Sequence, residues 1–319
     1  MKEINILDIE NIKIGNAQDH IAGTGCSVIL CENGAPTGLD IRGGGPASRE
    51  SALLNPLAAA DQIYGVVLSG GSAFGLDCTG GVMQYLEERS IGFDAGIAKV
   101  PLVCCSCIFD LIVGDKNVRP DKAMGYAAAM ASQENNYRDG NLGAGTGATV
   151  GKYYGPASMM KSGIGSYAVQ IGDLKIGAIV VVNALGNVYK PDSKEALAGL
   201  LNPDKTSVVN ICDVMYQDFG NLCFSGNTTI GALITNAKFD KTQMNKIAAM
   251  AQNGYVRTIR PINTTLDGDS LYALSVGDVS TDINLIGTLG ADVVAMAVQN
   301  AVCSAAPAYG LLCAADLQK

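Results

Sequence analysis

Clusters of glycine divide this sequence into short apolar runs, and this division constrains its fold more than any other feature. The chain has 319 residues, of which 39 are glycine, 48% are hydrophobic and 16% are charged. A chain of this length and apolarity buries a large core and is not disordered. Its most apolar stretches, Val100–Val113 and Ile176–Leu185, are shorter than the ~20 residues that a membrane span needs. The glycine clusters lie at Gly43–Gly45, Gly70–Gly71, Gly80–Gly81 and Gly143–Gly151.

The runs between the glycines are of two kinds. Short runs rich in branched residues predict strands at Tyr64–Leu68, Ile176–Asn183, Ile230–Asn236 and Leu271–Val276. Apolar residues at helical spacing predict helices at Leu76–Glu88, Asp121–Ser132, Lys241–Gln252 and Ile283–Val302. Both faces of the strands are apolar, which favours an α/β fold with sheets covered by helices. The polar, irregular segment Pro191–Ser225 is predicted to be a surface loop and the place of a chain break.

Charge and the N-terminal pattern indicate where the protein works. With 22 basic and 30 acidic side chains the formal charge is −8, and no basic block is present, so a nucleic-acid partner is not expected. Residues Met1–Asn16 alternate apolar and charged positions without a signal-peptide core. We therefore expect a cytoplasmic protein without a membrane partner.

A single histidine, His20, excludes several catalytic mechanisms. The segment Gly70–Phe74 is similar to a nucleophile elbow around Ser72, but Phe74 replaces the second glycine, and such a hydrolase needs a histidine after the serine. We interpret these glycines as allowing a helix to begin close to the preceding strand. Nothing pairs His20 with a particular thiol, so a Cys–His dyad is weakly supported.

The cysteines and one glycine-rich loop are similar to cofactor-binding motifs but lack residues that those motifs require. Cys104 and Cys107 form a C-x-x-C inside an apolar run, without the second pair that a zinc site needs, so core packing is the preferred interpretation. In Gly145–Lys152, five residues instead of four separate the loop's glycines, and Tyr153 follows the lysine where Ser or Thr is needed. We expect no metal, nucleotide or other cofactor. The ten cysteines are 26, 31, 78, 104, 105, 107, 212, 223, 303 and 313.

Without a suitable histidine, a hydroxyl can be activated by a lysine or by an N-terminal α-amine. If the chain were cut between Asn227 and Thr228, the α-amine of Thr228, with a pKa of about 8, would become a base beside its own hydroxyl. Gly226 would allow the strained backbone that exposes the Asn227 carbonyl to the Thr228 hydroxyl. The other interpretation, a turn leading into a strand, is the more typical one for so short a string.

Longer motifs decide between these interpretations. Spread over nearly the whole chain, and in this order, they are Gly23–Ile29, Asp40–Gly44, Leu68–Asp77, Ile108–Leu111, Arg119–Asp121, Gly143–Lys152, Val182–Ala184, Asn227–Ile230 and Asp267–Asp269. In these motifs the sequence resembles the L-aminopeptidase/D-esterase family (the P1 family of peptidases), which also contains β-aminopeptidases and nylon-oligomer hydrolases.

The resemblance implies a self-processing hydrolase. The family fold is an αββα sandwich that resembles the N-terminal-nucleophile hydrolases but has its own connectivity. The family's cut precedes a Ser or Thr, which matches Asn227–Thr228 here. A single domain, 1–319, would thus be cut into a large chain, 1–227, and a small chain, 228–319, of 92 residues. Homo-oligomers (tetramers or larger) and small peptide, amide or ester substrates are expected, with the substrate's identity left open.

Five residues receive roles from the resemblance. Thr228 is the nucleophile, and Asn183 supplies a side-chain amide to the oxyanion hole. Lys152 acts as a base, or stays charged and lowers the pKa of the α-amine. Asp267 and Asp269 orient the nucleophile or bind the ammonium group of the substrate. Without the resemblance, Lys152 would be interpreted as a surface charge and Asp267–Asp269 as a turn.

Three departures from the family limit this transfer. The cleavage point has Thr228 where some members have serine, Phe109 stands where some have a tyrosine in the oxyanion hole, and the histidines that many relatives carry around Gln252 and Asn263 are absent. The predicted function is an aminopeptidase or amidase acting through an acyl-enzyme at Thr228. The alternatives are a non-catalytic, oligomeric small-molecule-binding relative on the same scaffold, and a cysteine-dependent hydrolase or zinc protein.

Overall fold

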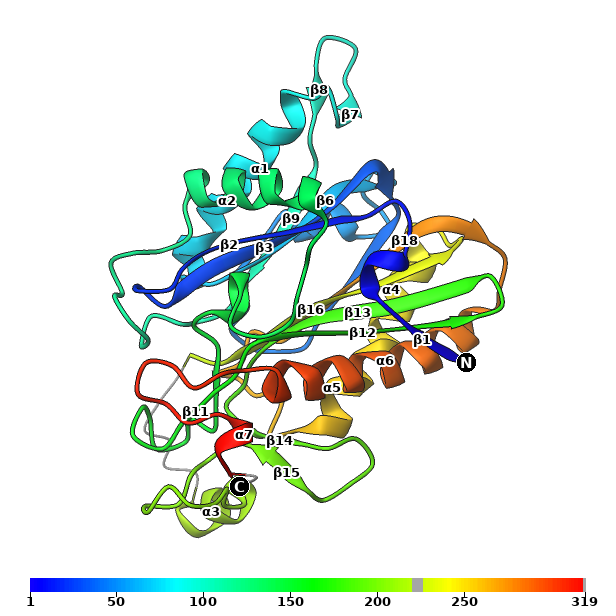
Figure 1. Ribbon diagram of the computed structural model, residues 1–319. Helices are drawn as coiled ribbons and strands as arrows, with labels where there is room; N and C mark the ends of the chain where they lie inside the picture. The colour runs from blue at the N-terminus through cyan, green and yellow to red at the C-terminus, as the bar shows by residue number, and fades with distance from the viewer. Residues whose placement is uncertain (220–225, 318–319) are drawn as a thin grey trace.

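Two β-sheets packed face to face form the centre of the protein (Figure 1). The computed structural model describes residues 1–219 and 226–317. In spatial order, sheet A consists of β1 (Lys2–Ile4), β12 (Ile164–Ile171), β13 (Leu174–Asn183), β16 (Thr228–Ala237), β18 (Ser270–Val279) and β4 (Thr37–Ile41). Sheet B consists of β2 (Lys13–Asp19), β3 (Thr24–Ala35), β6 (Ile63–Ser69), β9 (Val103–Cys107) and β5 (Ser48–Arg49). The β16–β18 and β6–β9 pairs are parallel and the other pairs in both sheets are antiparallel.

Helices cover the outer face of each sheet. The helices α4 (Lys241–Ala251), α5 (Asn253–Thr258) and α6 (Ile283–Cys303) lie on the side of sheet A. The helices α1 (Cys78–Glu87) and α2 (Lys122–Ala131) pack against each other on the side of sheet B. The layers therefore follow the αββα order that the resemblance implied.

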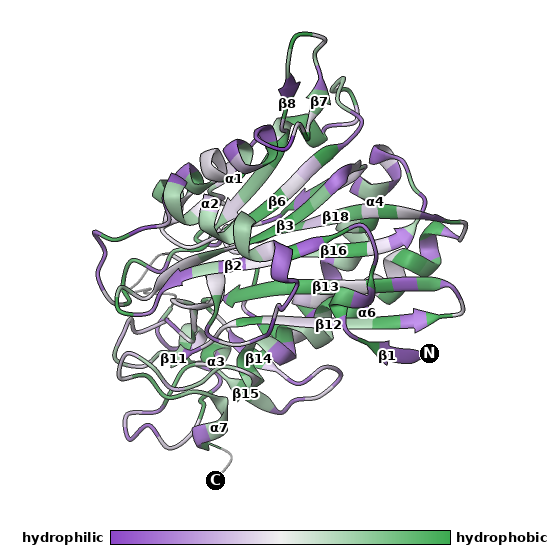
Figure 2. Ribbon diagram, turned by 45° about the horizontal axis from the view of Figure 1, so that its top comes forward, coloured by the Kyte–Doolittle hydropathy of each residue, from purple (hydrophilic) through white to green (hydrophobic). Residues whose placement is uncertain are grey.

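The strand β13 shows why apolar runs without alternation form the centre of this fold. Val180 and Val182 belong to the core between sheet A and its helices, whereas Ile179 and Val181 belong to the core between the two sheets. All four are fully buried. Because successive side chains of a strand point to opposite faces, a strand buried on both faces must be apolar at every position. The central strands of sheet A are accordingly green in Figure 2.

Three of the predicted helices begin at an aspartate. The side chains of Asp121, Asp240 and Asp282 accept hydrogen bonds from the first-turn amides of α2, α4 and α6. Such N-caps satisfy amides that have no partner within the helix. The fourth predicted helix begins as a 3₁₀ turn, Ser72–Asp77, which leads directly into α1. Gly71 and Ser72 have φ values of 79° and 54° there, so this segment starts a helix next to β6, as we interpreted it.

The helix α6 is the one described helix that is long and apolar enough, by length and composition, to cross a membrane. Within its most apolar window, 67% is buried inside the protein. It packs against β12, β13 and α4, and this burial accounts for its apolarity.

The segment Pro191–Ser225 was wrongly predicted to be entirely loop. It contains β15 (Ala196–Ala198) and α3 (Ile211–Gln217), while residues 220–225 lie outside the described part of the chain. The strand β15 is too short to show a period, and the helical spacing of Ile211, Val214 and Met215 in α3 extends over only seven residues. The strands β14 (Asn187–Tyr189) and β17 (Ile259–Arg260) join β15 in a small sheet. The remaining elements are β7 (Phe93–Asp94), β8 (Lys99–Val100), β10 (Thr149–Val150), β11 (Met160–Lys161) and α7 (Ala314–Leu317).

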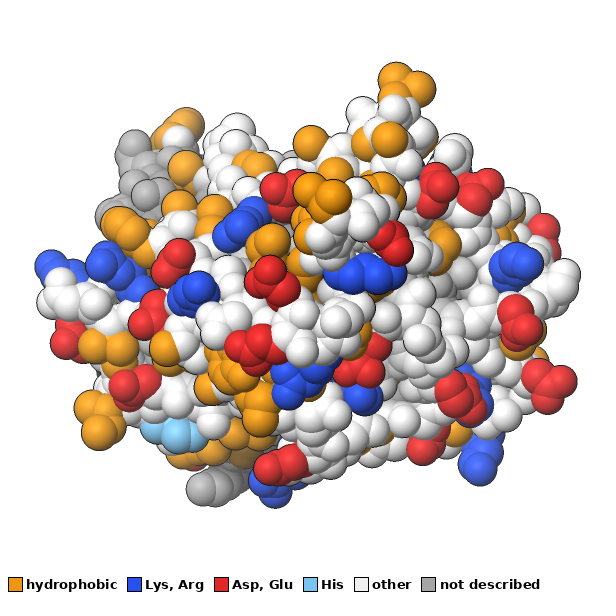
Figure 3. Space-filling view, turned by 90° about the horizontal axis from the view of Figure 1, so that it is seen from above, with side chains coloured by type: hydrophobic (Ala, Val, Ile, Leu, Met, Phe, Trp, Pro, Cys, Tyr) orange, Lys and Arg blue, Asp and Glu red, His pale blue; other side chains and the backbone are white. Residues whose placement is uncertain are grey.

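Most of the described thiols are buried, as the core-packing interpretation predicted. Cys104 and Cys107 are buried in β9, and Cys26, Cys31, Cys78, Cys105 and Cys313 are buried as well. Cys212 is partly exposed and Cys303 is exposed, which differs from the prediction, and Cys223 lies outside the described residues. Figure 3 shows acidic and basic side chains interspersed over the face seen from above.

Candidate active site

The ends of two neighbouring strands bring Thr228 and Asn183 together. Thr228 is the first residue of β16 and Asn183 is the last residue of β13, and the antiparallel register pairs them directly. Asn183 is fully buried, and the exposed fraction of Thr228 is only 5%. Residues 45 positions apart in sequence therefore meet at one end of sheet A.

The Thr228 hydroxyl touches the peptide bond that precedes it. Its Oγ1 donates a short hydrogen bond to the carbonyl oxygen of Asn227. The same oxygen accepts a hydrogen bond from the backbone N–H of Gly268 at 3.0 Å. Gly226 has a φ of 117°, a conformation that favours glycine. The hydroxyl thus lies against a carbonyl that is polarised by a second donor.

Lys152 lies in the same buried region. Its Nζ donates to the carbonyl oxygen of Asn183 at 2.7 Å and to that of Gly226 at 3.4 Å. The side chain is fully buried, and this burial lowers the pKa of Lys152 to about 7, although Asp267, Asp110 and Asp269 partly oppose the shift. The interpretation of Lys152 as a surface charge is therefore wrong.

The two aspartates adopt different environments beside Thr228. Asp269 accepts hydrogen bonds from the backbone N–H of Thr229 at 2.5 Å and of Asn263 at 2.9 Å. Burial, together with the charge of Asp267, raises the pKa of Asp269 to about 7. Asp267 pairs with Asn227 in a β-bridge, and its Oδ2 accepts two hydrogen bonds from Thr264 at 2.7 and 2.6 Å. Burial also raises the pKa of Asp267.

The Asn183 amide is held by two backbone groups, one in the loop after β9 and one in β10. Its Nδ2 donates to the carbonyl oxygen of Phe109 at 3.1 Å, and its Oδ1 accepts from the backbone N–H of Thr149 at 3.1 Å. Among the described residues, the donor on the Asn227 carbonyl besides Thr228 is Gly268 and not Asn183. All five residues predicted for the site nevertheless lie around one peptide bond.

Comparisons with known proteins agree with this arrangement. The family model described as "Peptidase family S58" matches residues 5–312. The chain belongs to peptidase family S58. It is therefore a hydrolase of the aminopeptidase/amidase type, and the resemblance stated from the sequence is confirmed.

Several relatives of this S58 peptidase have descriptive names. An uncharacterized aminopeptidase of Mycobacterium bovis is 32% identical, covering 96% of this chain and 96% of its own. A 6-aminohexanoate-oligomer endohydrolase of Kocuria sp. is 28% identical, covering 85% of this chain and 75% of its own.

Solved structures share the fold of the S58 chain. The L-aminopeptidase D-Ala-esterase/amidase of Ochrobactrum anthropi, described as a new variant among the Ntn-hydrolase folds, has a TM-score of 0.69 at 18% identity and covers 94% of this chain and 86% of its own. A β-aminopeptidase of Burkholderia sp. has a TM-score of 0.67 at 17% identity, covering 98% and 92%. The predicted fold class is therefore confirmed.

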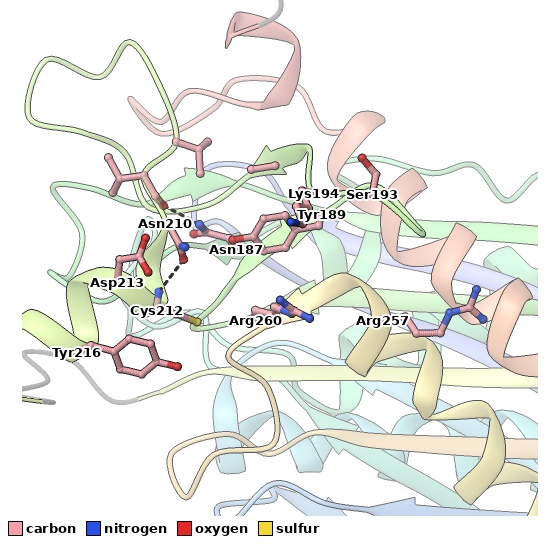
Figure 4. A pocket seen from close by; sticks show the side chains of 13 residues that line it. Asn187, Tyr189, Ser193, Lys194, Asn210, Cys212, Asp213, Tyr216, Arg257 and Arg260 are labelled. Carbon is pink, nitrogen blue, oxygen red and sulfur yellow. Dashed lines mark hydrogen bonds between the residues drawn. The ribbon is translucent and has the colours of Figure 1, made fainter.

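A large cavity of this S58 peptidase does not include Thr228 in its walls. It has a volume of about 760 Å³ and is lined by the small sheet, α3 and α5, as Figure 4 shows, with Asn187, Arg260 and Tyr216 among its walls. No residue predicted for the site lines it. Thr228 itself is only 5% exposed and contacts the carbonyl oxygen of the preceding residue.

Several polar groups near the site were not singled out from the sequence. Gly268 and Thr149 lie inside motifs that carried the resemblance, but a backbone N–H leaves no signal in a sequence. Lys161 is a second fully buried lysine, whose Nζ donates to the carbonyl oxygens of Gly145 and Ala148, both at 3.0 Å. Burial lowers the pKa of Lys161 to about 7.

The buried lysine at 161 predicts an unusual dependence of stability on pH. In the unfolded chain its pKa returns to about 10.4, so the unfolded state binds more protons between about pH 7 and pH 10. The free energy of unfolding should therefore rise with pH over this range, and the Lys161→Met variant should lack this contribution. Urea unfolding with and without Lys161→Met, at pH 7, 8.5 and 10 and in a Thr228→Ala background, measures the difference. Equal pH dependence of the two proteins would contradict the prediction.

Proposed function

We propose that this S58 peptidase is made as a precursor that cleaves itself between Asn227 and Thr228, and then hydrolyses amide bonds through an acyl-enzyme at Thr228. The observation that carries the proposal is the contact of Thr228 Oγ1 with the Asn227 carbonyl, on which Gly268 donates a second hydrogen bond. Hydroxyl, carbonyl and a second hydrogen-bond donor are thereby brought together, which favours attack on this carbonyl.

Self-cleavage would proceed in two steps. Thr228 Oγ1 attacks the Asn227 carbonyl carbon while a base removes its proton, and the negative oxygen is stabilised by the Gly268 N–H. The peptide C–N bond breaks and its nitrogen gains a proton, which leaves an ester on Oγ1 and a free α-amine on Thr228. Water then hydrolyses the ester and releases the carboxylate of Asn227. Lys152 can act as the base, since its lowered pKa gives a neutral amine near pH 7.

The new α-amine of Thr228 would then act as a base during substrate hydrolysis. It lies on the same residue as the hydroxyl, beside Asp269, which binds the next backbone amide along the chain. In turnover the hydroxyl attacks a substrate carbonyl, the amine leaves, and water hydrolyses the acyl-enzyme. Asn183, fixed by Phe109 and Thr149, would donate its amide to the oxyanion of the substrate.

The proposed substrates are small peptides and related amides or esters. The names of relatives, an aminopeptidase and an oligomer endohydrolase, support amide bonds as the common chemistry. Intact-mass spectrometry of freshly purified protein tests self-cleavage, and a panel of amino-acid p-nitroanilides then tests turnover. Two fragments with turnover would support the proposal, whereas fragments without turnover on a broad panel would favour the non-catalytic alternative.

Gly226 provides a separate prediction about the geometry of cleavage. A Cβ added there would lie 2.7 Å from the Phe109 ring, and the φ of 117° is unfavourable for any other residue. The Gly226→Ala variant should therefore cleave at least about tenfold more slowly, since a misplacement of about 1 Å can cost 10²-fold in rate. A time course of intact mass after rapid purification measures this.

A matched control is Gly155→Ala. Gly155 also has a positive φ, 79°, but a Cβ there meets nothing within 4 Å, so cleavage should proceed at the wild-type rate. Wild-type cleavage by Gly226→Ala would show that the geometry of this residue is unimportant.

A further inference from the structure

We infer that Asp110 is a positioning residue for this site, holding the Phe109 carbonyl that orients the Asn183 amide. The inference rests on the proposed function, because it concerns the residue that would bind the substrate oxyanion. Asp110 follows β9 and is 1% exposed, and the resemblance gives it no role.

The carboxylate of Asp110 joins three loops. Its Oδ2 accepts a hydrogen bond from Thr24 Oγ1 at 2.7 Å, and its Oδ1 accepts one from the backbone N–H of Gly71 at 2.7 Å. Two glycines allow this close approach, since a Cβ at Gly70 would lie 2.0 Å from Oδ2 and one at Gly147 would lie 2.9 Å from it. Asp110 therefore fixes the loop after β9 against the start of β3 and the turn after β6.

Phe109, the residue before Asp110, contacts the site through both its carbonyl group and its ring. Its carbonyl oxygen accepts the hydrogen bond from Asn183 Nδ2 at 3.1 Å. Its ring lies over Gly226, where an added Cβ would approach the ring to 2.7 Å. A shift of the 108–110 backbone would thus move both the proposed oxyanion donor and the residue two positions before Thr228.

The environment of Asp110 favours a role in function over a role in stability. Within the described part of the chain it makes no ion pair, and its hydrogen-bond donors are neutral. Burial raises the pKa of Asp110 to about 6, although Thr24, Gly71 and the more distant charge of Lys152 favour the carboxylate. Burying a neutral side chain of the same shape would cost less free energy than burying a carboxylate. Groups whose pKa is shifted in this way are more frequent at functional sites.

The test is Asp110→Asn, which keeps the shape and removes the charge. The Thr24 hydroxyl can turn to accept a hydrogen bond from the new amide, so the melting temperature should stay within a few degrees of the wild type. Loss of charge-assisted hydrogen bonds should slow self-cleavage about tenfold. On the p-nitroanilide that the wild type hydrolyses fastest, kcat of the processed enzyme should fall about tenfold with KM unchanged.

Two further variants keep the test decisive. Thr24→Val retains the carboxylate and removes one of its hydrogen bonds, so it should also lower kcat, by a smaller factor. This variant tests the inference if Asp110→Asn fails to fold. Asp139→Asn is the matched control, because Asp139 also has a pKa raised by burial but accepts its hydrogen bond from Ser166 on β12, and kcat should not change.

The inference is overturned if Asp110→Asn and Thr24→Val cleave and turn over at wild-type rates, or if their kcat falls only in proportion to a lost folded fraction. Its failure is distinct from failure of the proposed function. If Thr228→Ala stays uncut while Asp110→Asn behaves as the wild type, only the role of Asp110 is wrong.

Discussion

Replacing Thr228 by alanine should leave a single uncut chain of 319 residues without hydrolase activity. The wild type should instead yield fragments of 227 and 92 residues, the second beginning with Thr228. The reason is that Thr228 Oγ1 is the group that contacts the Asn227 carbonyl, so its removal takes away the nucleophile and leaves the peptide bond with only its Gly268 donor. Intact-mass spectrometry measures the fragments, and N-terminal sequencing of the small fragment locates the cut.

Two variants separate loss of the nucleophile from damage to the strand. Thr228→Ser keeps the hydroxyl and should still process. Thr229→Val changes the adjacent residue, whose fully buried hydroxyl has no hydrogen-bond partner among the described residues, to a side chain of the same shape. It should therefore process at a rate close to the wild type. If Thr228→Ala were cut at the same bond, Thr228 would not be the nucleophile.

The strands β6, β13, β16 and β18 could be predicted from the sequence, because strands buried on both faces appear as short runs of apolar residues. The strands β2, β3 and β4 of the same two sheets were not predicted. The strands β13 and β16 are apolar on both faces, and α6 combines an aspartate cap with helical spacing over 21 residues. The strand β12 was missed because its middle carries Ser166 and Tyr167, which are only partly buried. Short elements such as β15 and α3 gain their stability from packing against neighbours and not from local periodicity.

The site could be assembled only through the resemblance. The sequence alone favoured a surface position for Lys152 and a turn for Asp267–Asp269, whereas the structure buries all three of Lys152, Asp267 and Asp269. The antiparallel register that places Asn183 opposite Thr228 depends on long-range pairing, which no local pattern encodes. The partners that orient the site are largely backbone groups, such as the Gly268 N–H and the Phe109 carbonyl.

Replacing Lys152 by methionine should nearly abolish self-cleavage and turnover. Methionine fills a similar volume without a polar atom that can accept a proton, so the fold can be kept while the base is lost. We expect the rate to fall by roughly 10²–10⁴-fold, the usual contribution of a general base. Lys241→Met is the matched control. Lys241 is also buried, with Nζ donating to the carbonyl oxygens of Ala58 and Ala60 at 2.6 and 2.8 Å, but it lies beyond the opposite end of β16 from Thr228. Its replacement should leave cleavage unchanged or change only stability.

The pH profile of Lys152→Met distinguishes a base from a packing residue. Burial lowers the pKa of Lys152 to about 7, so in the wild type the neutral amine is lost as the pH falls below this value. The cleavage rate should therefore rise from pH 5.5 to pH 7 and level off above about pH 8. Asp269, with its pKa raised to about 7, becomes ionised over the same range and adds to the rise. In Lys152→Met only the contribution of Asp269 remains, so the residual rate should depend less steeply on pH. A parallel profile with an unchanged slope would mean that Lys152 only packs against the site, and that the base which removes the Thr228 proton lies elsewhere.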